Sequence, residues 1–162
     1  MRAWVFGDDI DTDAIAPGRY MKSGIEEIAK HCLESVLPNF PKEVRTGDAL
    51  VAGRNFGAGS SREQAPEALK HLGVAVLIAE SFAGIFYRNA INLGLPAVAC
   101  RHAKRIRQDD DLEINLEDGK VHNRTTGETL DCEPIPAFLM TIVRDGGLLP
   151  HLEKKLARAP QR

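Results

Sequence analysis

The chain has 162 residues, of which 43% are hydrophobic and 27% are charged, and this composition excludes disordered, collagen-like and coiled-coil proteins. Its 21 basic and 23 acidic side chains leave a formal net charge of -2, so neither nucleic acid nor a membrane is an expected partner. The sequence holds no apolar stretch near the ~20 residues of a membrane helix, and its N-terminus turns acidic too early for a signal peptide. We therefore expect a cytoplasmic protein with a single domain over residues 1–162.

Strands and helices alternate in the first two thirds of the chain. Short apolar runs predict strands at residues 3–6, 49–52, 74–79 and 95–100. The spacing of apolar side chains predicts helices at residues 25–33, 61–72 and 82–93. This order predicts parallel strands joined by right-handed crossover connections.

The start of the second helix carries a capping signal. Ser60 or Ser61 occupies the expected capping position, and Glu63 and Gln64 follow three residues after them, which predicts a capping box. Gly73 is expected to end this helix.

Loops connect these strands and helices, and the final third of the chain no longer alternates strand with helix. Residues 8–23 read as irregular, residues 38–41 as a proline-bracketed loop, and residues 101–107 as a solvated basic loop compensated by the aspartates at 109–111. Short strands are expected at residues 112–116, 121–124 and 128–132, and helices at residues 137–143 and 148–157. The predicted fold class is α/β, with a parallel β-α-β core and a short C-terminal strand-plus-helix region.

The sequence predicts no metal site. Its three cysteines, Cys32, Cys100 and Cys132, are widely spread and form no Cys-x-x-Cys pair, so we expect small hydrophobic or partly exposed thiols. No two histidines have the spacing of metal ligands. We therefore expect the chain to hold neither zinc nor an iron–sulfur cluster by itself.

A glycine-rich loop between a strand and a helix is the most informative stretch. Gly57 and Gly59 allow close approach of the backbone to a ligand, Ser60 and Ser61 add hydroxyl groups, and Arg62 adds a fixed fork of donors. A helix N-terminus also attracts anions, so this arrangement suits a carboxylate or phosphate. The alternative is a turn with serine caps and a surface arginine. The loop matches neither the Walker A pattern nor the dinucleotide-binding fingerprint.

Residues 57–63, Gly-Ala-Gly-Ser-Ser-Arg-Glu, resemble the Gly-x-Gly-Ser-Ser-Arg-Glu signature of the swivelling domain of the aconitase superfamily. Residues 8–13 are similar to the start of that domain in the small subunits of isopropylmalate isomerases and homoaconitases. Residues 79–83 and 88–96 resemble its continuation, so the resemblance covers residues 7–98 closely and the rest loosely. It implies a swivelling β/β/α domain.

The resemblance also implies a reaction and a partner. In this family a large subunit, joined in a heterodimer or heterotetramer, carries a [4Fe-4S] cluster whose open iron is a Lewis acid. Water is removed from a 2-hydroxy acid and added back at the neighbouring carbon. Ser60 matches the base that takes the carbon-bound proton, Arg62 matches the group that binds a substrate carboxylate, and Ser61 lies beside it. Asp13 aligns with an active-site aspartate that positions a cation, and its alternative role is to cap a turn.

In this family one loop contacts the group that distinguishes one substrate from another. The corresponding residues here are Tyr20, Met21, Lys22 and Ser23. Apolar residues there suit an isopropyl group and an arginine suits a further carboxylate, but this sequence departs from both patterns. Lys22 could contact a carboxylate as a point charge, or could equally be a solvated lysine. The expected substrate is 3-isopropylmalate, interconverted with 2-isopropylmalate in leucine biosynthesis, while homoaconitate, citramalate and related hydroxy di- or tricarboxylates stay open. The rival hypotheses are a non-catalytic carboxylate- or phosphate-binding module and a regulatory or assembly subunit.

Overall fold

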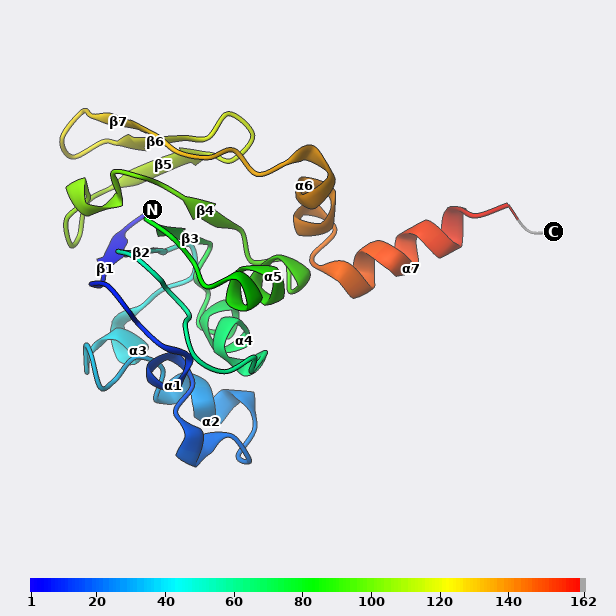
Figure 1. Cartoon of the computed structure of the whole chain (residues 1–162), viewed down its shortest axis with the longest axis horizontal. Coiled ribbons are helices and arrows are strands. Elements are labelled where there is room, and N and C mark those ends of the chain that lie inside the picture. The colour runs from blue at the N-terminus through cyan, green and yellow to red at the C-terminus, as the bar shows by residue number, and fades with distance from the viewer. Residues whose placement is uncertain (161–162) are drawn as a thin grey trace.

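The computed structural model describes residues 1–160, which form three layers (Figure 1). The middle layer is a four-stranded parallel sheet of β1 (Ala3–Val5), β2 (Ala49–Ala52), β3 (Val76–Ala79) and β4 (Ala97–Ala99), in that spatial order. Ala49 pairs with both Ala3 and Val76, and Leu77 pairs with Ala97. The predicted parallel core is therefore confirmed.

Helices cover one face of this sheet. They are α1 (Thr12–Ile15), the 3-10 helix η1 (Gly18–Tyr20), α2 (Ile25–Lys30), α3 (Phe40–Glu43), α4 (Gln64–His71) and α5 (Gly84–Asn92). Because side chains alternate along a strand, Trp4, Leu50 and Leu77 enter the core on this side. The Phe40 ring packs edge-on against Trp4 with a centroid distance of 5.3 Å.

A second sheet covers the opposite face. It consists of β5 (Leu112–Asn115), β6 (Lys120–Asn123) and β7 (Thr129–Asp131), which are antiparallel and lie in sequence order. Val51 and Ile78 of the parallel sheet share a core with Val121 and Leu130 of this sheet. The 3-10 helix η2 (Ala103–Arg105) follows β4, and α6 (Ala137–Arg144) adds Met140 to the same core.

The last helix, α7 (Leu148–Arg158), projects away from the three layers (Figure 1). None of its residues is buried, and Leu149 and Leu156 are 72% and 75% exposed. No helix within residues 1–160 is long and apolar enough to span a membrane.

The loops after the first three strands run beside one another, which brings the sequence motifs together. The amide of Gly57 donates to the carbonyl of Ile10 at 2.7 Å, and the amide of Thr12 donates to the carbonyl of Ala58 at 2.8 Å. The amide of Phe56 donates to the carbonyl of Ser81 at 3.0 Å. These loops all leave the carboxyl ends of parallel strands, where open α/β sheets bind ligands.

Two loop predictions are wrong. Residues 8–23 contain α1 and η1, because the Asp11 side chain caps α1 by accepting the Ala14 amide at 2.8 Å. Residues 38–41 lead directly into α3, where Pro41 lies in the first turn and so removes no hydrogen bond that the helix needs.

The predicted capping box at Ser60 and Ser61 is also wrong. Helix α4 begins at Gln64 and no side chain caps it. The Ser60 hydroxyl instead accepts a hydrogen bond from Arg62 Nε at 2.7 Å, and the Ser60 amide donates to Thr12 Oγ1 at 3.1 Å. These contacts keep residues 60–62 out of the helix.

The basic segment 101–107 differs from the expectation as well. Its cations pair with distant carboxylates, Lys104 with Asp8 at 3.2 Å and Arg105 with Glu128 at 2.7 Å, and not with the aspartates that follow. Asp110 is buried and accepts a hydrogen bond from Asn123 Nδ2 at 2.7 Å. The segment is therefore tied to the loop after β1 and to the turn between β6 and β7, and its side-chain charges are not compensated within the loop.

Candidate active site

The glycine loop after β2 needs its two central glycines for different reasons. Gly57 has φ +86°, and a Cβ there would lie 2.2 Å from Phe86 Cγ on α5. Gly59 has φ +116°, and a Cβ there would lie 2.9 Å from Thr12 Oγ1. Because L-residues rarely adopt these φ values, both positions require glycine for backbone conformation and for space. The glycines thus bring the loop against α1 and α5.

The Ser60 hydroxyl lies between a cation and a second hydroxyl. Its Oγ accepts a hydrogen bond from Arg62 Nε at 2.7 Å and lies 3.3 Å from Thr12 Oγ1. The residue is exposed, whereas Thr12 is only 2% exposed. Ser60 is therefore accessible from outside, while its partner from α1 lies within the protein.

The Arg62 guanidinium is held by α1 and by Ala16, the residue that ends it. Its NH1 group donates to the carbonyl of Ala16 at 2.9 Å and to Asp13 Oδ1 at 3.3 Å. Asp13 Oδ1 also accepts the Gly18 amide at 3.0 Å. Among residues 1–160, the acceptors of Arg62 engage Nε and NH1, which leaves the NH2 donors for a ligand.

Ser61 is exposed beside these groups, and its backbone is fixed from α5. The side chain of Asn89 donates to the Ser61 carbonyl at 3.2 Å. Sequence reasoning gave no role to Asn89, Thr12 or Ala16, although all three lie in or beside the motifs. The contacts of Asn89 with Ser61 and of Arg62 with Ala16 both use a backbone carbonyl as acceptor, and a pattern of side chains does not reveal such contacts.

Residues 20–23 connect η1 to α2, and their side chains differ in burial and in what they contact. Tyr20 stacks on His31 with a centroid distance of 3.7 Å and an interplanar angle of 3°. Met21 packs against the helix-side core, while Lys22 and Ser23 are exposed. Their roles in substrate selection stay predictions, as do those of Ser60, Ser61, Arg62 and Asp13.

His31 links this segment to two carboxylates. Its Nδ1 lies 2.8 Å from Glu34 Oε2 and its Nε2 lies 3.2 Å from Glu27 Oε1. The hydrogen bond to Glu34, followed by that to Glu27, raises the pKa of His31, and desolvation opposes this. The two carboxylates therefore favour a protonated imidazole beneath the ring of Tyr20.

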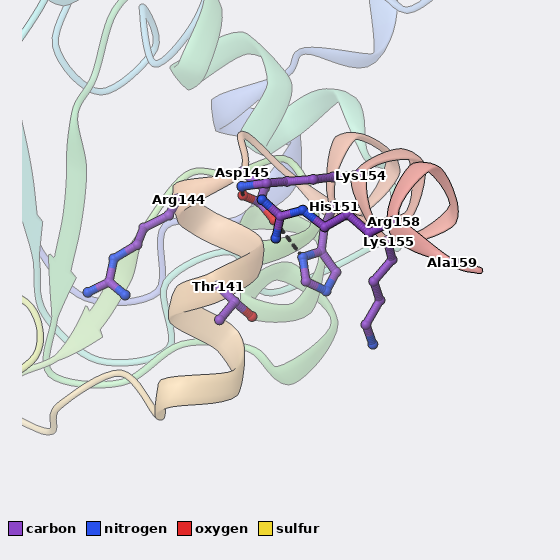
Figure 2. A pocket seen from close by; sticks show the side chains of 8 residues that line it. All are labelled: Thr141, Arg144, Asp145, His151, Lys154, Lys155, Arg158 and Ala159. Carbon is purple, nitrogen blue, oxygen red and sulfur yellow. Dashed lines mark hydrogen bonds and ion pairs between the residues drawn. The ribbon is translucent and has the colours of Figure 1, made fainter.

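A cavity of about 550 Å³ lies between α6 and α7 (Figure 2). Asp145 accepts hydrogen bonds there from His151 Nδ1 at 2.7 Å and from Lys154 Nζ at 2.9 Å. The Lys154 and His151 hydrogen bonds lower the pKa of Asp145. The remaining lining residues are Thr141, Arg144, Lys155, Arg158 and Ala159. None of them belongs to the sequence motifs, so this cavity is not the predicted site.

The three cysteines do not meet at one place, although Cys100 and Cys132 are in contact. Cys32 is buried in the core on the helix side, where burial raises the pKa of its thiol. Cys100 and Cys132 lie on the opposite side of the sheet. Within residues 1–160, no cluster of three or more His, Cys, Asp or Glu side chains could hold a metal ion.

The chain is similar to known proteins along most of its length. The family model of the aconitase C-terminal domain matches residues 15–102. The 3-isopropylmalate dehydratase small subunit 1 of Methanopyrus kandleri is 54% identical over 98% of this chain and 94% of its own length. The isopropylmalate/citramalate isomerase small subunit of Methanocaldococcus jannaschii is 50% identical, covering 98% and 95% respectively.

A solved structure has a similar fold. A crystal structure of 3-isopropylmalate dehydratase from Methanocaldococcus jannaschii superposes with a TM-score of 0.91 at 44% identity, covering 96% of this chain and 93% of that one. The expected α/β fold class is thereby confirmed.

Proposed function

The chain belongs to the aconitase C-terminal domain family, and we propose that it is the small subunit of a hydro-lyase of the 3-isopropylmalate dehydratase type, active only with a large subunit. The observation that carries the proposal is the Ser60 hydroxyl 2.7 Å from Arg62 Nε on an exposed loop. A hydroxyl beside a fixed cation, open to a partner, suits proton transfer at a carboxylate substrate.

Arg62 binds a substrate carboxylate in this proposal. Its Nε and NH1 groups are committed to Ser60, Ala16 and Asp13, and these contacts orient the plane of the guanidinium. The NH2 donors then face the substrate with little loss of side-chain freedom. Ser61 supplies a second hydroxyl on the same exposed stretch.

Ser60 takes the proton from the substrate carbon. The electrons of the broken C–H bond form the C=C bond as hydroxide leaves the neighbouring carbon. Hydroxide then adds to the carbon that lost the proton while Ser60 returns its proton to the carbon that lost hydroxide, which completes the re-addition of water and gives the isomer. A serine hydroxyl is a weak base at neutral pH, so the cation and donors around its oxygen are needed to stabilise the alkoxide.

The residues of this chain do not fit an iron–sulfur cluster, because Cys32 lies on one side of the sheet and only Cys100 and Cys132 lie together on the other. The proposal therefore assigns the [4Fe-4S] cluster to the large subunit, where it supplies a Lewis acid for the leaving oxygen. The exposed faces of Ser60 and Ser61 suit a site that a second chain completes in a heterodimer or heterotetramer. A cytoplasmic location belongs to the same proposal.

The proposed substrate pair is 2-isopropylmalate and 3-isopropylmalate. Met21 offers an apolar contact for the isopropyl group, while the exposed Lys22 offers a charge for a further carboxylate. Citramalate and homoaconitate are the alternatives, and the citramalate alternative is supported by the name of one relative, an isopropylmalate/citramalate isomerase small subunit.

The test is an anaerobic assay of the chain mixed with its candidate large subunit, after reconstitution of the cluster. Isopropylmalate, homocitrate and citramalate are offered separately. We expect turnover that requires both chains, falls by about 10² or more in Ser60→Ala, and falls strongly in Arg62→Lys. Arg45→Lys, an exposed arginine before β2, is the matched control.

Two outcomes would move the function elsewhere. If a formed, cluster-loaded complex turns over none of these hydroxy acids, a non-catalytic carboxylate- or phosphate-binding module becomes the better description. If turnover occurs and Ser60→Ala leaves it intact, the chain is a regulatory or assembly subunit.

A further inference from the structure

Thr12 makes two contacts with Ser60 that the sequence motifs do not explain. Its Oγ1 accepts the Ser60 amide at 3.1 Å and lies 3.3 Å from Ser60 Oγ. The threonine is 2% exposed, and its own amide is fixed to the Ala58 carbonyl at 2.8 Å. A buried hydroxyl is thus held against the atom that the proposed function makes the base.

The direction of the contact between the two hydroxyls follows from the other bonds. Among residues 1–160, Ser60 is the one hydrogen-bonding partner of Thr12 Oγ1. If Ser60 donated to Thr12, the buried hydroxyl hydrogen of Thr12 would have no acceptor, which costs free energy. If Thr12 donates to Ser60 Oγ, the buried hydroxyl is satisfied, and the Ser60 hydrogen points toward the exposed side.

We infer that Thr12 is a positioning residue that donates its hydroxyl hydrogen to Ser60 Oγ, so that Thr12 and Arg62 together stabilise the alkoxide form of Ser60. Two donors on one oxygen form an arrangement like an oxyanion hole, which favours the charged form of the oxygen over the neutral one. The Ser60 amide contact fixes the same hydroxyl pair from the backbone. The inference rests on the proposed function for its catalytic meaning.

Gly59 contributes to this arrangement of Thr12, Ser60 and Arg62. A Cβ at residue 59 would lie 2.9 Å from Thr12 Oγ1, so a side chain there would displace the hydroxyl from Ser60. Gly59, which precedes Ser60, therefore leaves space for Thr12 Oγ1, the second donor to Ser60 Oγ. Two carboxylates lie near this pair: Asp13 contacts Arg62 and Asp11 accepts the Ala14 amide, and among residues 1–160 neither hydrogen-bonds Ser60.

The first test needs neither the large subunit nor turnover. Ser60→Cys places a titratable thiol at the same position, and its pKa is measured from the pH dependence of iodoacetamide alkylation, read at position 60 by peptide mass spectrometry. We expect a pKa below the usual value of about 8.5, because Arg62 and Thr12 stabilise the thiolate. Adding Thr12→Val should raise that pKa by roughly half a unit to one unit, whereas Thr12→Ser should not.

The second test uses the assembled enzyme. Thr12→Val should lower kcat by about 10- to 100-fold with little change in KM, since Ser60 acts on the transition state. Thr12→Ser, which keeps the donor, should recover most of the loss. Thr12→Ala is a second donor-free variant if Thr12→Val folds poorly, as judged by thermal unfolding.

The outcomes separate the inference from the proposed function. If Thr12→Val leaves the thiol pKa of the Ser60→Cys variant unchanged, or if Thr12→Val and Thr12→Ser lower kcat equally, the role of Thr12 is overturned even where Ser60→Ala abolishes turnover. A shifted thiol pKa with no turnover in any assembled complex would support the donor pair while contradicting the dehydratase function.

Discussion

Asp13 Oδ1 lies 3.3 Å from Arg62 NH1 and forms an ion pair across the space between α1 and the loop before α4. The same oxygen accepts the Gly18 amide at 3.0 Å. The Asp13 side chain is 70% exposed, whereas the Arg62 side chain is 25% exposed. The carboxylate therefore contributes orientation of the arginine more than stability of the fold.

Replacing Asp13 should weaken substrate binding in proportion to the acceptors that are lost. Asp13→Asn keeps an oxygen for Arg62 and Gly18 and should raise KM by about 3- to 10-fold, while Asp13→Ala removes the acceptor and should raise it by about 10- to 100-fold. Steady-state kinetics of the assembled enzyme measure both. Asp9→Asn, on the neighbouring loop, is the control, and an unchanged KM in Asp13→Ala would contradict the orienting role.

Gly57→Ala should destabilise the chain, because the new Cβ would lie 2.2 Å from Phe86 Cγ at a residue with φ +86°. Strain and overpacking together are expected to lower the free energy of unfolding by about 2–4 kcal/mol. Gly84→Ala is the matched control, since no atom lies within 4 Å of a Cβ there and the residue begins α5. Chemical denaturation of the isolated chain distinguishes the two, and equal stabilities would contradict the close packing of the loop on α5.

His31 should make stability depend on pH. Its pKa is raised, chiefly by Glu34 and then by Glu27, so its contribution is fully present below the unfolded value of about 6.5 and is lost as pH rises through the folded pKa. Lys30 shares Glu27 at 3.4 Å, and Tyr20 stacks on the ring. We compare the free energy of unfolding of the wild type with that of His31→Gln. The excess of the wild type should be larger at pH of about 5.5 than at pH of about 8. Glu34→Gln should shrink this difference, and a difference that grew with pH would contradict the pairing.

Lys22→Met should change substrate preference. Removing the exposed charge should lower kcat/KM for a substrate with a third carboxylate by about 10-fold, with a smaller effect on isopropylmalate. Competition assays with both substrates measure the ratio, and Lys42→Met, another exposed lysine, is the control. An equal loss on both substrates would remove Lys22 from substrate selection.

The parallel sheet could be predicted from the sequence because its strands are continuous apolar runs between glycine-ended helices. Such runs are typical of a sheet covered on both faces. The boundaries predicted for the helices and loops fared less well at residues 8–23, 38–41 and 60–63. The short helix α1 depends on the Asp11 cap, α3 begins around Pro41 without a side-chain cap, and the Ser60 hydroxyl is bound to Arg62 instead of capping α4. Hydrophobic periodicity reports none of these local features.

By itself, the sequence determined the order of strands and helices and the set of residues in the glycine loop. The tertiary structure alone decided what those residues contact. Ser60 meets Thr12, which lies 48 positions away, and Arg62 meets Asp13, which lies 49 positions away. The reason is that adjacent parallel strands bring their following loops together at one edge of the sheet, and a hydrogen bond depends on distance in space and not on separation along the chain.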